Sequence, residues 1–522
     1  MGRAINNKVI LLSAAGFFFV AVVVPLLVLL FSAIFKEGSA AGQSITSILQ
    51  EDVLQSIGNS LIISISVGLL SVLLGGCFAF LFSKTTIPFS KALRLLLLLP
   101  LLLPSYVICV AWNDVWFFAG VHKNLIYSLP AVVFVLTTIY TPLAAFIIQN
   151  GLININAGME EAGMMMTSYK NVFFRIVLPL LRPALFSSFI LIFILSLSEF
   201  AVPSFLSVPV FVTEIFTQFS AFYNYSLAAT HSLILTAICL LLLLPERKYL
   251  TSEHFFSFGK RNFRFKVFEL HNKATPLVFA VLYIILTVLM PVLLLTAQTF
   301  LAAGTPFPDI IIMLLPSAKD SLFIAVAGAL IVTLFGLIFS WLTVHFKFKF
   351  LQTMLLFVFA IPAIVIGVSL ILFYNTPSLN FIYSSMLIIL IAFTARFLFI
   401  SVKIISDSLQ QIPVSFTDAA YMMGTTPFYI FRNISLPLLG EALFTSFFII
   451  LILCLNELST VIMIYPPGTS LLPVNIFTRT ANAPQQLVSG MSLVALLFTI
   501  IILLCMFFAK KILFSQQWRE NR

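Results

Sequence analysis

The chain has 522 residues, of which 61% are hydrophobic and only 9% are charged. Soluble proteins carry about 45–50% apolar and about 25% charged residues. So little charge cannot cover the surface of a soluble fold, which excludes a cytosolic enzyme, a nucleic-acid-binding protein and a disordered chain. The apolar runs are about 20 residues long, as membrane helices require, whereas barrel strands are shorter and alternate. We therefore predict an all-α polytopic membrane protein.

Twelve apolar runs predict twelve transmembrane helices. Pro104 and Pro362 interrupt the third and ninth runs, and Pro203 and Pro466 blur the ends of the fifth and eleventh. The first run is longer than the core of a signal peptide, so we expect it to be a retained helix. The predicted spans are 9–35, 57–83, 92–117, 126–149, 182–207, 226–245, 276–298, 319–344, 350–374, 382–403, 438–464 and 487–512.

The distribution of Lys and Arg predicts the orientation of these spans. With the N-terminus placed inside, 24 of the 28 basic residues, Arg396 and Lys403 among them, fall in cytoplasmic segments. Cytoplasmic loops of membrane proteins are enriched in Lys and Arg. We therefore expect both termini to be cytoplasmic, and we attribute the net charge of +10 to this bias rather than to nucleic-acid binding.

The two halves of the chain resemble each other. GNSL at 58–61 recurs as KDSL at 319–322, PSYVICV from Pro104 recurs as PAIVIGV from Pro362, and IFT at 215–217 recurs at 476–478. The offsets are close to half the chain, and an even number of spans per unit makes the repeats parallel. We predict a first repeat over 1–245, a basic cytoplasmic linker over 246–274 and a second repeat over 275–522. The linker either contacts anionic lipid headgroups or is an ordinary cytoplasmic connection.

Two long loops, 150–181 and 404–437, carry matching motifs on the predicted cytoplasmic side. The first runs from Glu160 to Pro179 and the second from Asp418 to Pro437, a separation of 19 residues in both. An acidic residue at a helix start is favoured by the helix dipole. Gly424 in the second loop permits a sharp turn between two helices.

The motif E-A-A, three residues, G, nine residues, I-x-L-P resembles the signature loop of ATP-binding-cassette importer permeases, and this chain carries it twice. The resemblance implies the MetI-like fold of type I importers, two parallel six-helix repeats, and loops over 158–168 and 416–426 that sit in a groove of a cytosolic ATPase and carry its motion to the membrane. It assigns this coupling to Glu160, Glu161, Ala162, Met166, Ile176, Leu178, Pro179, Asp418, Ala419, Ala420, Gly424, Ile434, Leu436 and Pro437.

The first loop departs from the family pattern. Glu161 stands where the first Ala is usual, and Met166 stands where the Gly is usual. A frame that starts at Glu161 would break the 19-residue spacing to Pro179. Either the turn at Met166 has a different geometry, or the first loop docks less typically.

The resemblance also implies the partners of the chain. These are two copies of the ATPase, which bind ATP and Mg, an extracytoplasmic substrate-binding protein and the lipid bilayer of a bacterial inner membrane, with no nucleic acid. The sequence contains no GxxxxGK[ST] loop, no arrangement of a nucleophile with a base and no spacing of metal ligands. We therefore expect a transport subunit that is not an enzyme and holds no cofactor or metal of its own.

The fused form and the segments 196–216 and 456–478 are similar to the ferric-iron importer subfamily. Thiamine and aminoethylphosphonate permeases share the fused form, so both cargoes remain alternatives. A secondary transporter or channel is a remote alternative, because such proteins often have inverted repeats and ion-coupling carboxylates near the membrane midplane.

Two carboxylates lie at matching places in the predicted spans. Glu199 follows Pro179 by 20 residues, and Glu457 follows Pro437 by 20. Ionisable groups within spans are expensive to bury and are candidate functional sites. The pair either lines the translocation path or its gate, or caps helix ends and pairs across the repeat axis. Asp114 is expected at an outer helix end rather than in a pore.

Overall fold

The computed structural model describes residues 13, 15–35, 50–250, 274–345, 349–480 and 482–513. Across these ranges the chain is built from helices, with no strand element. Nine of the helices are long and apolar enough to span a membrane, and three bent helix pairs raise the possible total to twelve. The all-α polytopic fold is thereby confirmed.

The helices follow one another in a similar order in the two halves of the chain. In the first half they are η1 (Phe19–Val23, a π-helix), α2 (Val24–Phe35), α4 (Glu51–Lys84), α5 (Ser90–Leu102), α6 (Ser105–Phe118), α7 (Lys123–Ile126), α8 (Leu129–Ile153), α9 (Ala157–Met166), α10 (Tyr169–Val172), η2 (Phe173–Val177, π), α11 (Leu178–Leu197), α12 (Ala201–Phe205), α13 (Phe211–Ser220) and α14 (Tyr225–Leu250). In the second half they are α15 (Ala274–Ile284), η3 (Ile285–Leu289, π), α16 (Met290–Leu301), α17 (Phe307–His345), α18 (Lys349–Ala360), α19 (Ala363–Tyr374), α20 (Asn380–Tyr383), α21 (Leu387–Leu409), α22 (Val414–Met422), α23 (Pro427–Ile430), η4 (Phe431–Ser435, π), α24 (Leu436–Leu438), α25 (Gly440–Asn456), α26 (Val461–Ile464), α27 (Leu472–Thr480) and α28 (Gln485–Leu513).

The third and ninth predicted spans are each two helices that meet at a sharp bend. The angle is 102° between α5 and α6 and 100° between α18 and α19. Pro104 and Pro362 are the N-cap residues of the second halves. Proline lacks an N–H and disfavours helical backbone in the residue before it, so a helix that meets it ends there.

The predicted bounds of the fifth and eleventh spans are wrong. The fifth, expected over 182–207, is a helix over Tyr169–Leu197, followed by the separate short helix α12. The eleventh, expected over 438–464, is a pair of helices bent by 64° that ends at Asn456, with α26 beyond it. Hydropathy alone joins short apolar helices to the span beside them, because it does not register the breaks around Glu199 and Glu457.

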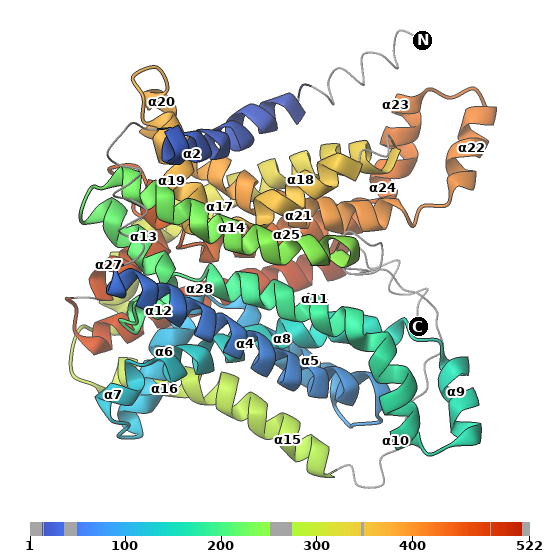
Figure 1. Cartoon of the computed structure of the whole chain (residues 1–522), viewed down its shortest axis with the longest axis horizontal. Coiled ribbons are helices and arrows are strands. Elements are labelled where there is room, and N and C mark those ends of the chain that lie inside the picture. The colour runs from blue at the N-terminus through green and yellow to red at the C-terminus, as the bar shows by residue number, and fades with distance from the viewer. Residues whose placement is uncertain are drawn as a thin grey trace.

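The two repeats interlock. Within the repeats, α4 packs on α8 and α11, and α17 packs on α21 and α25. Between them, α2 and α14 of the first repeat pack on α19, while α16 and α28 of the second pack on α6. The second half of each broken helix therefore lies against the first and last spans of the other repeat (Figure 1). Consistent with this, one hydrophobic cluster contains residues of both halves.

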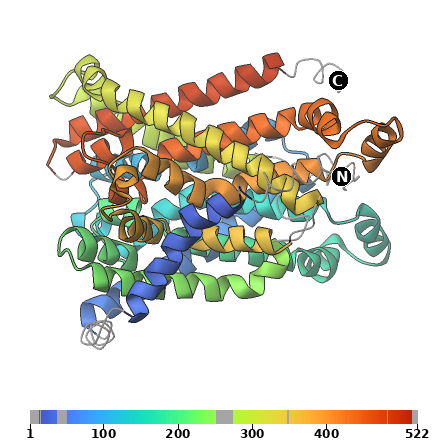
Figure 2. The ribbon, with the colours of Figure 1, turned by 90° about the horizontal axis from the view of Figure 1, so that it is seen from above.

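The two ends of the bundle differ. Figures 1 and 2 both show α9 and α22 projecting from the same end, and Figure 1 shows the short helices α7, α13, α20 and α27 at the opposite end. The predicted basic linker falls outside the described residues, except for its first five residues, which continue α14, and Ala274, which begins α15.

Candidate functional site: two projecting hairpins and a buried ionic cluster

The first hairpin consists of α9 and the helical arm that follows it, α10 with η2. Asn156 caps α9, since its Oδ1 accepts a hydrogen bond of 2.9 Å from the backbone N–H of Gly158. The helix ends at Met166, and only Thr167 and Ser168 separate it from α10. At Gly163 an added Cβ would come within 2.8 Å of Ile176 Cδ1, so α9 lies directly on the arm.

The second hairpin consists of α22 with α23 and η4, and its turn is longer. Four residues, 423–426, separate its helices, and among them Gly424 has φ +75°, a conformation that suits glycine. The hydroxyl of Thr425 donates a hydrogen bond of 2.7 Å to the carbonyl of Ala420, which is buried. The first hairpin thus turns with a different geometry at Met166, where φ is not positive.

The acidic residues of the two hairpins have different environments. Glu160 is fully buried and forms an ion pair with Lys84, the last residue of α4, which is buried as well. Asp418 is exposed, and so is Glu161. The 19-residue spacing pairs Glu160 with Asp418, but only Asp418 is accessible at the surface.

Methionines form the exposed tips of both hairpins. The exposed fractions are 89% for Met165, 90% for Met166, 89% for Met422 and 82% for Met423. Methionine is flexible and polarisable, and it is common on surfaces that bind other proteins. Adjacent apolar side chains exposed on a projecting helix mark a candidate interaction surface.

The remaining motif residues lie where each hairpin joins its long membrane helix. Pro179 lies at the start of α11 and Pro437 at the start of α24, within helical segments that continue from the hairpins, so each proline removes one N–H from the helical hydrogen bonds. A π-helical turn precedes each proline and contains Ile176 or Ile434, with Leu178 or Leu436 opening the helix. The π-helical turn followed by a proline is common to both copies, but the first continues as one helix to Leu197, whereas the second is bent by 64° between α24 and α25.

The two predicted intramembrane carboxylates lie beside the broken helices. Glu199 accepts a 2.9 Å hydrogen bond from the hydroxyl of Ser105, the first residue of α6, and a 3.4 Å one from Tyr140. Glu457 accepts hydrogen bonds from the backbone N–H and the hydroxyl of Thr460, at 2.9 and 3.1 Å. The Thr460 hydroxyl also lies within hydrogen-bond distance of the carbonyl of Ala363, the first residue of α19.

Arg396 joins this cluster, although its place in the sequence assigned it to a cytoplasmic segment. It lies within α21, nine residues from the helix start, and its Nε is 3.5 Å from Glu457 Oε2. The cytoplasmic assignment of Arg396 is wrong, because the charge count treats every basic residue near a span end as a loop residue. A signal was present, since Arg396 is the one charged residue in the segment ILIAFTARFLFISV, residues 389–402.

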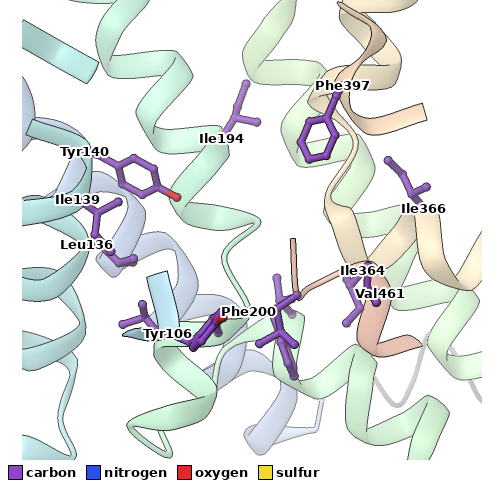
Figure 3. Packing of buried hydrophobic residues seen from close by; sticks show 14 of the residues in the cluster. Tyr106, Leu136, Ile139, Tyr140, Ile194, Phe200, Ile364, Ile366, Phe397 and Val461 are labelled. Carbon is purple, nitrogen blue, oxygen red and sulfur yellow. The ribbon is translucent and has the colours of Figure 1, made fainter. Parts of the chain in front are cut away.

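The ionic cluster lies near the boundary between the repeats. Asn456, next to Glu457 in the second repeat, donates a 3.0 Å hydrogen bond to the carbonyl of Leu102 in the first. Figure 3 shows buried side chains of one hydrophobic cluster, which includes Tyr106, Tyr140 and Phe200 of the first repeat and Ile364 and Val461 of the second. The hydrogen-bond and ion-pair partners described for each carboxylate lie in its own repeat, so pairing across the repeat axis and a role in transport both stay predictions. Within the described ranges no three His, Cys, Asp or Glu side chains are grouped to hold a metal ion.

Comparison with known proteins identifies similar transport subunits. The family model described as "Binding-protein-dependent transport system inner membrane component" matches residues 71–245 and 345–518, which together exceed half of the chain. The chain is 24% identical to the Fe(3+)-transport system permease protein FbpB 2 of Haemophilus influenzae, over 88% of this chain and 90% of that protein. It is 23% identical to the ferric transport system permease protein FbpB of Actinobacillus pleuropneumoniae, over 87% and 71%. A putative 2-aminoethylphosphonate transport system permease protein, PhnV of Salmonella typhimurium, is 31% identical over 28% of this chain and 54% of that protein.

Proposed function

This chain belongs to the family of binding-protein-dependent transport system inner membrane components, and from that premise we propose that it is the transmembrane subunit of an ATP-driven importer of ferric iron. It acts as a permease and not as an enzyme. The observation that carries the ATP-driven mechanism is the pair of projecting hairpins at one end of the bundle, each with exposed methionines at its tip.

In this proposal each hairpin docks into one copy of a cytosolic ATPase, so two copies bind the single chain. ATP and Mg bind to those partners. A substrate-binding protein delivers the cargo at the opposite end, where α7, α13, α20 and α27 lie. We propose in addition that both termini lie in the cytoplasm of a bacterial cell and that the bundle spans its inner membrane.

The interlocked repeats supply a route by which movement of the hairpins reaches the centre of the bundle. Each hairpin continues into a long helix, α11 or the α24–α25 pair, and these helices end beside Glu199 and Glu457. A change in the separation of the hairpins would move the two carboxylates relative to each other and to Arg396. We propose that this cluster lines the translocation path and that its rearrangement accompanies alternating access.

Ferric iron is favoured as the cargo by two observations. The relatives named as ferric permeases match most of this chain, whereas the aminoethylphosphonate relative matches 28% of it. The cluster offers carboxylate oxygens from Glu199 and Glu457 together with the phenol of Tyr140, and hard cations favour oxygen ligands. Thiamine and aminoethylphosphonate are the alternative cargoes, and a secondary transporter or channel is a remote alternative.

Uptake of labelled ferric iron tests the proposal in cells that lack their own ferric importers and express the chain with its partners. We expect uptake that requires ATP and is lost in the double variant Met422→Asp, Met423→Asp at equal membrane abundance. Phe89→Asp changes another strongly exposed apolar residue, 77% exposed, outside the hairpins and serves as the control.

Each of the other results identifies an alternative. Uptake of labelled thiamine or aminoethylphosphonate in place of iron would keep the importer and replace the cargo. Iron uptake that continues after ATP is depleted would contradict the ATP-driven mechanism and favour a channel or secondary transporter.

A further inference from the structure

We infer that Glu161, and not Glu160, is the carboxylate that the first hairpin presents to the ATPase, in the place that Asp418 has on the second hairpin. Glu160 is instead a positioning residue that ties α9 to α4 through Lys84. The inference rests on the proposed function, because it concerns the surface that meets the ATPase.

The inward faces of α9 and α22 are shifted by one residue relative to the spacing of the motifs. Counting back from Pro179 and Pro437 pairs Glu160 with Asp418. On α9, however, the buried or half-buried positions are 157, 160, 163 and 164, whereas on the described part of the α22 surface they are 417 and 420. Burial therefore pairs Glu160 with Thr417 and Gly163 with Ala420. One residue corresponds to a rotation of about 100° on an α-helix, so the two alignments are structurally distinct.

The exposed faces agree with the alignment by burial. This alignment pairs Glu161 with Asp418. It also pairs the tip methionines, Met165 with Met422 and Met166 with Met423. The members of each methionine pair differ by 8 percentage points of exposure or less. The longer turn of the second hairpin, which contains Gly424, restores the common spacing before Pro437.

The contacts of Glu160 leave it unable to meet a partner. Its side chain is 0% exposed and that of Lys84 1%, and the two form an ion pair. Reaching an ATPase would require Glu160 to leave Lys84 buried and unpaired, which is strongly unfavourable. In the second repeat, Thr417 takes the position of Glu160 and His345 takes the position of Lys84. His345 stacks on Trp341, with ring centroids 3.8 Å apart.

The shift has a consequence for symmetry. Two identical ATPase subunits can bind two different hairpins in the same way only if the exposed groups coincide. Here they coincide when α9 is read from Glu161, with an acid followed at four and five residues by two exposed methionines in both copies. The partner that fits this surface has an apolar groove with a basic side chain at one end.

The experiment measures affinity for the ATPase that co-purifies with the tagged wild-type chain, after that ATPase has been identified by mass spectrometry and purified alone. Binding to the permease in lipid nanodiscs is measured over a range of salt concentrations. We expect Glu161→Gln and Asp418→Asn each to weaken binding about two- to fivefold at low salt and to reduce its salt dependence equally. The double variant Lys84→Met, Glu160→Met replaces the buried pair by an apolar pair and should retain the wild-type salt dependence.

A second measurement does not depend on how the double variant folds. Single cysteines at positions 160, 161 and 418, in a background lacking the exposed Cys77 and Cys505, are treated with a charged maleimide. Positions 161 and 418 should react and become protected when the ATPase is added, whereas position 160 should not react. The inference is overturned if Glu161→Gln leaves binding unchanged, or if position 160 is the one that reacts and is protected. Failure of the wild-type chain to bind any ATPase would instead overturn the proposed function.

Discussion

Arg396 and Glu457 form an ion pair inside the helix bundle, with Nε 3.5 Å from Oε2 and exposed side-chain fractions of 14% and 9%. Removing one partner of a buried pair leaves an uncompensated charge and costs about 3–5 kcal/mol. We therefore expect Glu457→Gln or Arg396→Met alone to lower the thermal stability of the purified protein markedly and to abolish uptake.

The double variant Arg396→Met, Glu457→Gln separates stability from transport. When both charges are removed, no buried ion is left without a partner, so most of the lost thermal stability should return. Uptake should remain lost if the pair lines the translocation path. Recovery of uptake together with stability would show that the pair has a structural role only.

Asp114 joins the two repeats at the end of α6. Its carboxylate accepts hydrogen bonds of 2.7 Å from Gln485 Nε2 and from the Ser489 hydroxyl, both on α28. In Asp114→Asn one acceptor becomes an amide donor that faces another donor, so a buried group loses its partner at a cost of about 2 kcal/mol. We expect a lower melting temperature of the purified protein.

Ser489→Ala provides the graded comparison for Asp114. It removes one donor and leaves the Gln485 contact in place, so the loss of stability should be smaller, about 1 kcal/mol. Equal melting temperatures for wild type and Asp114→Asn would contradict a stabilising contact between α6 and α28.

Much of the fold could be predicted from the sequence because a bilayer imposes a length on each apolar run. Most of the spans, the helical class and the duplicated six-helix unit follow from hydropathy and from offsets such as Pro104 to Pro362. The bends of about 100° could not be predicted, although the prolines mark where they occur. The size of a bend is determined by the helices packed around it, which here come from the other repeat.

The candidate site was predictable only in part. The hairpins and both carboxylates were located by spacing, since a repeat preserves distances along the chain. Spacing pairs Glu160 with Asp418, although Glu160 is buried and Asp418 exposed, because the turn between α9 and α10 is shorter than its counterpart. Arg396 and Lys84 were missed as members of ion pairs, because their acidic partners lie 61 and 76 residues away and no local pattern connects them.

Because Glu160 is buried in an ion pair with Lys84, we expect its replacement by an amide to affect thermal stability more than the same change at Asp418. Glu160→Gln should lower the melting temperature of the purified chain, since it leaves the Lys84 ammonium buried without a counter-ion at a cost of about 3–5 kcal/mol. Asp418→Asn changes an exposed side chain and should leave the melting temperature within about 1 °C of wild type. Similar losses in both variants would contradict the different burial of the two acids.

Gly424 is the residue on which the conformation of the second hairpin depends most directly. Its φ of +75° is costly for a residue with a Cβ, by roughly 1–2 kcal/mol, although an added Cβ would meet no atom within 4 Å. We therefore expect Gly424→Ala to loosen the turn through backbone strain and not through a steric clash. The measurement is amide hydrogen exchange, which should become faster across 420–430.

Gly424→Asn is the informative comparison, because asparagine tolerates the left-handed conformation better than alanine. It should restore much of the protection while adding a larger side chain. Met166→Ala, at the last helical position of α9, changes no residue with positive φ and should leave exchange in the first hairpin unaltered. If Gly424→Ala exchanged like the wild type and Gly424→Asn exchanged faster, side-chain size and not backbone conformation would control the turn.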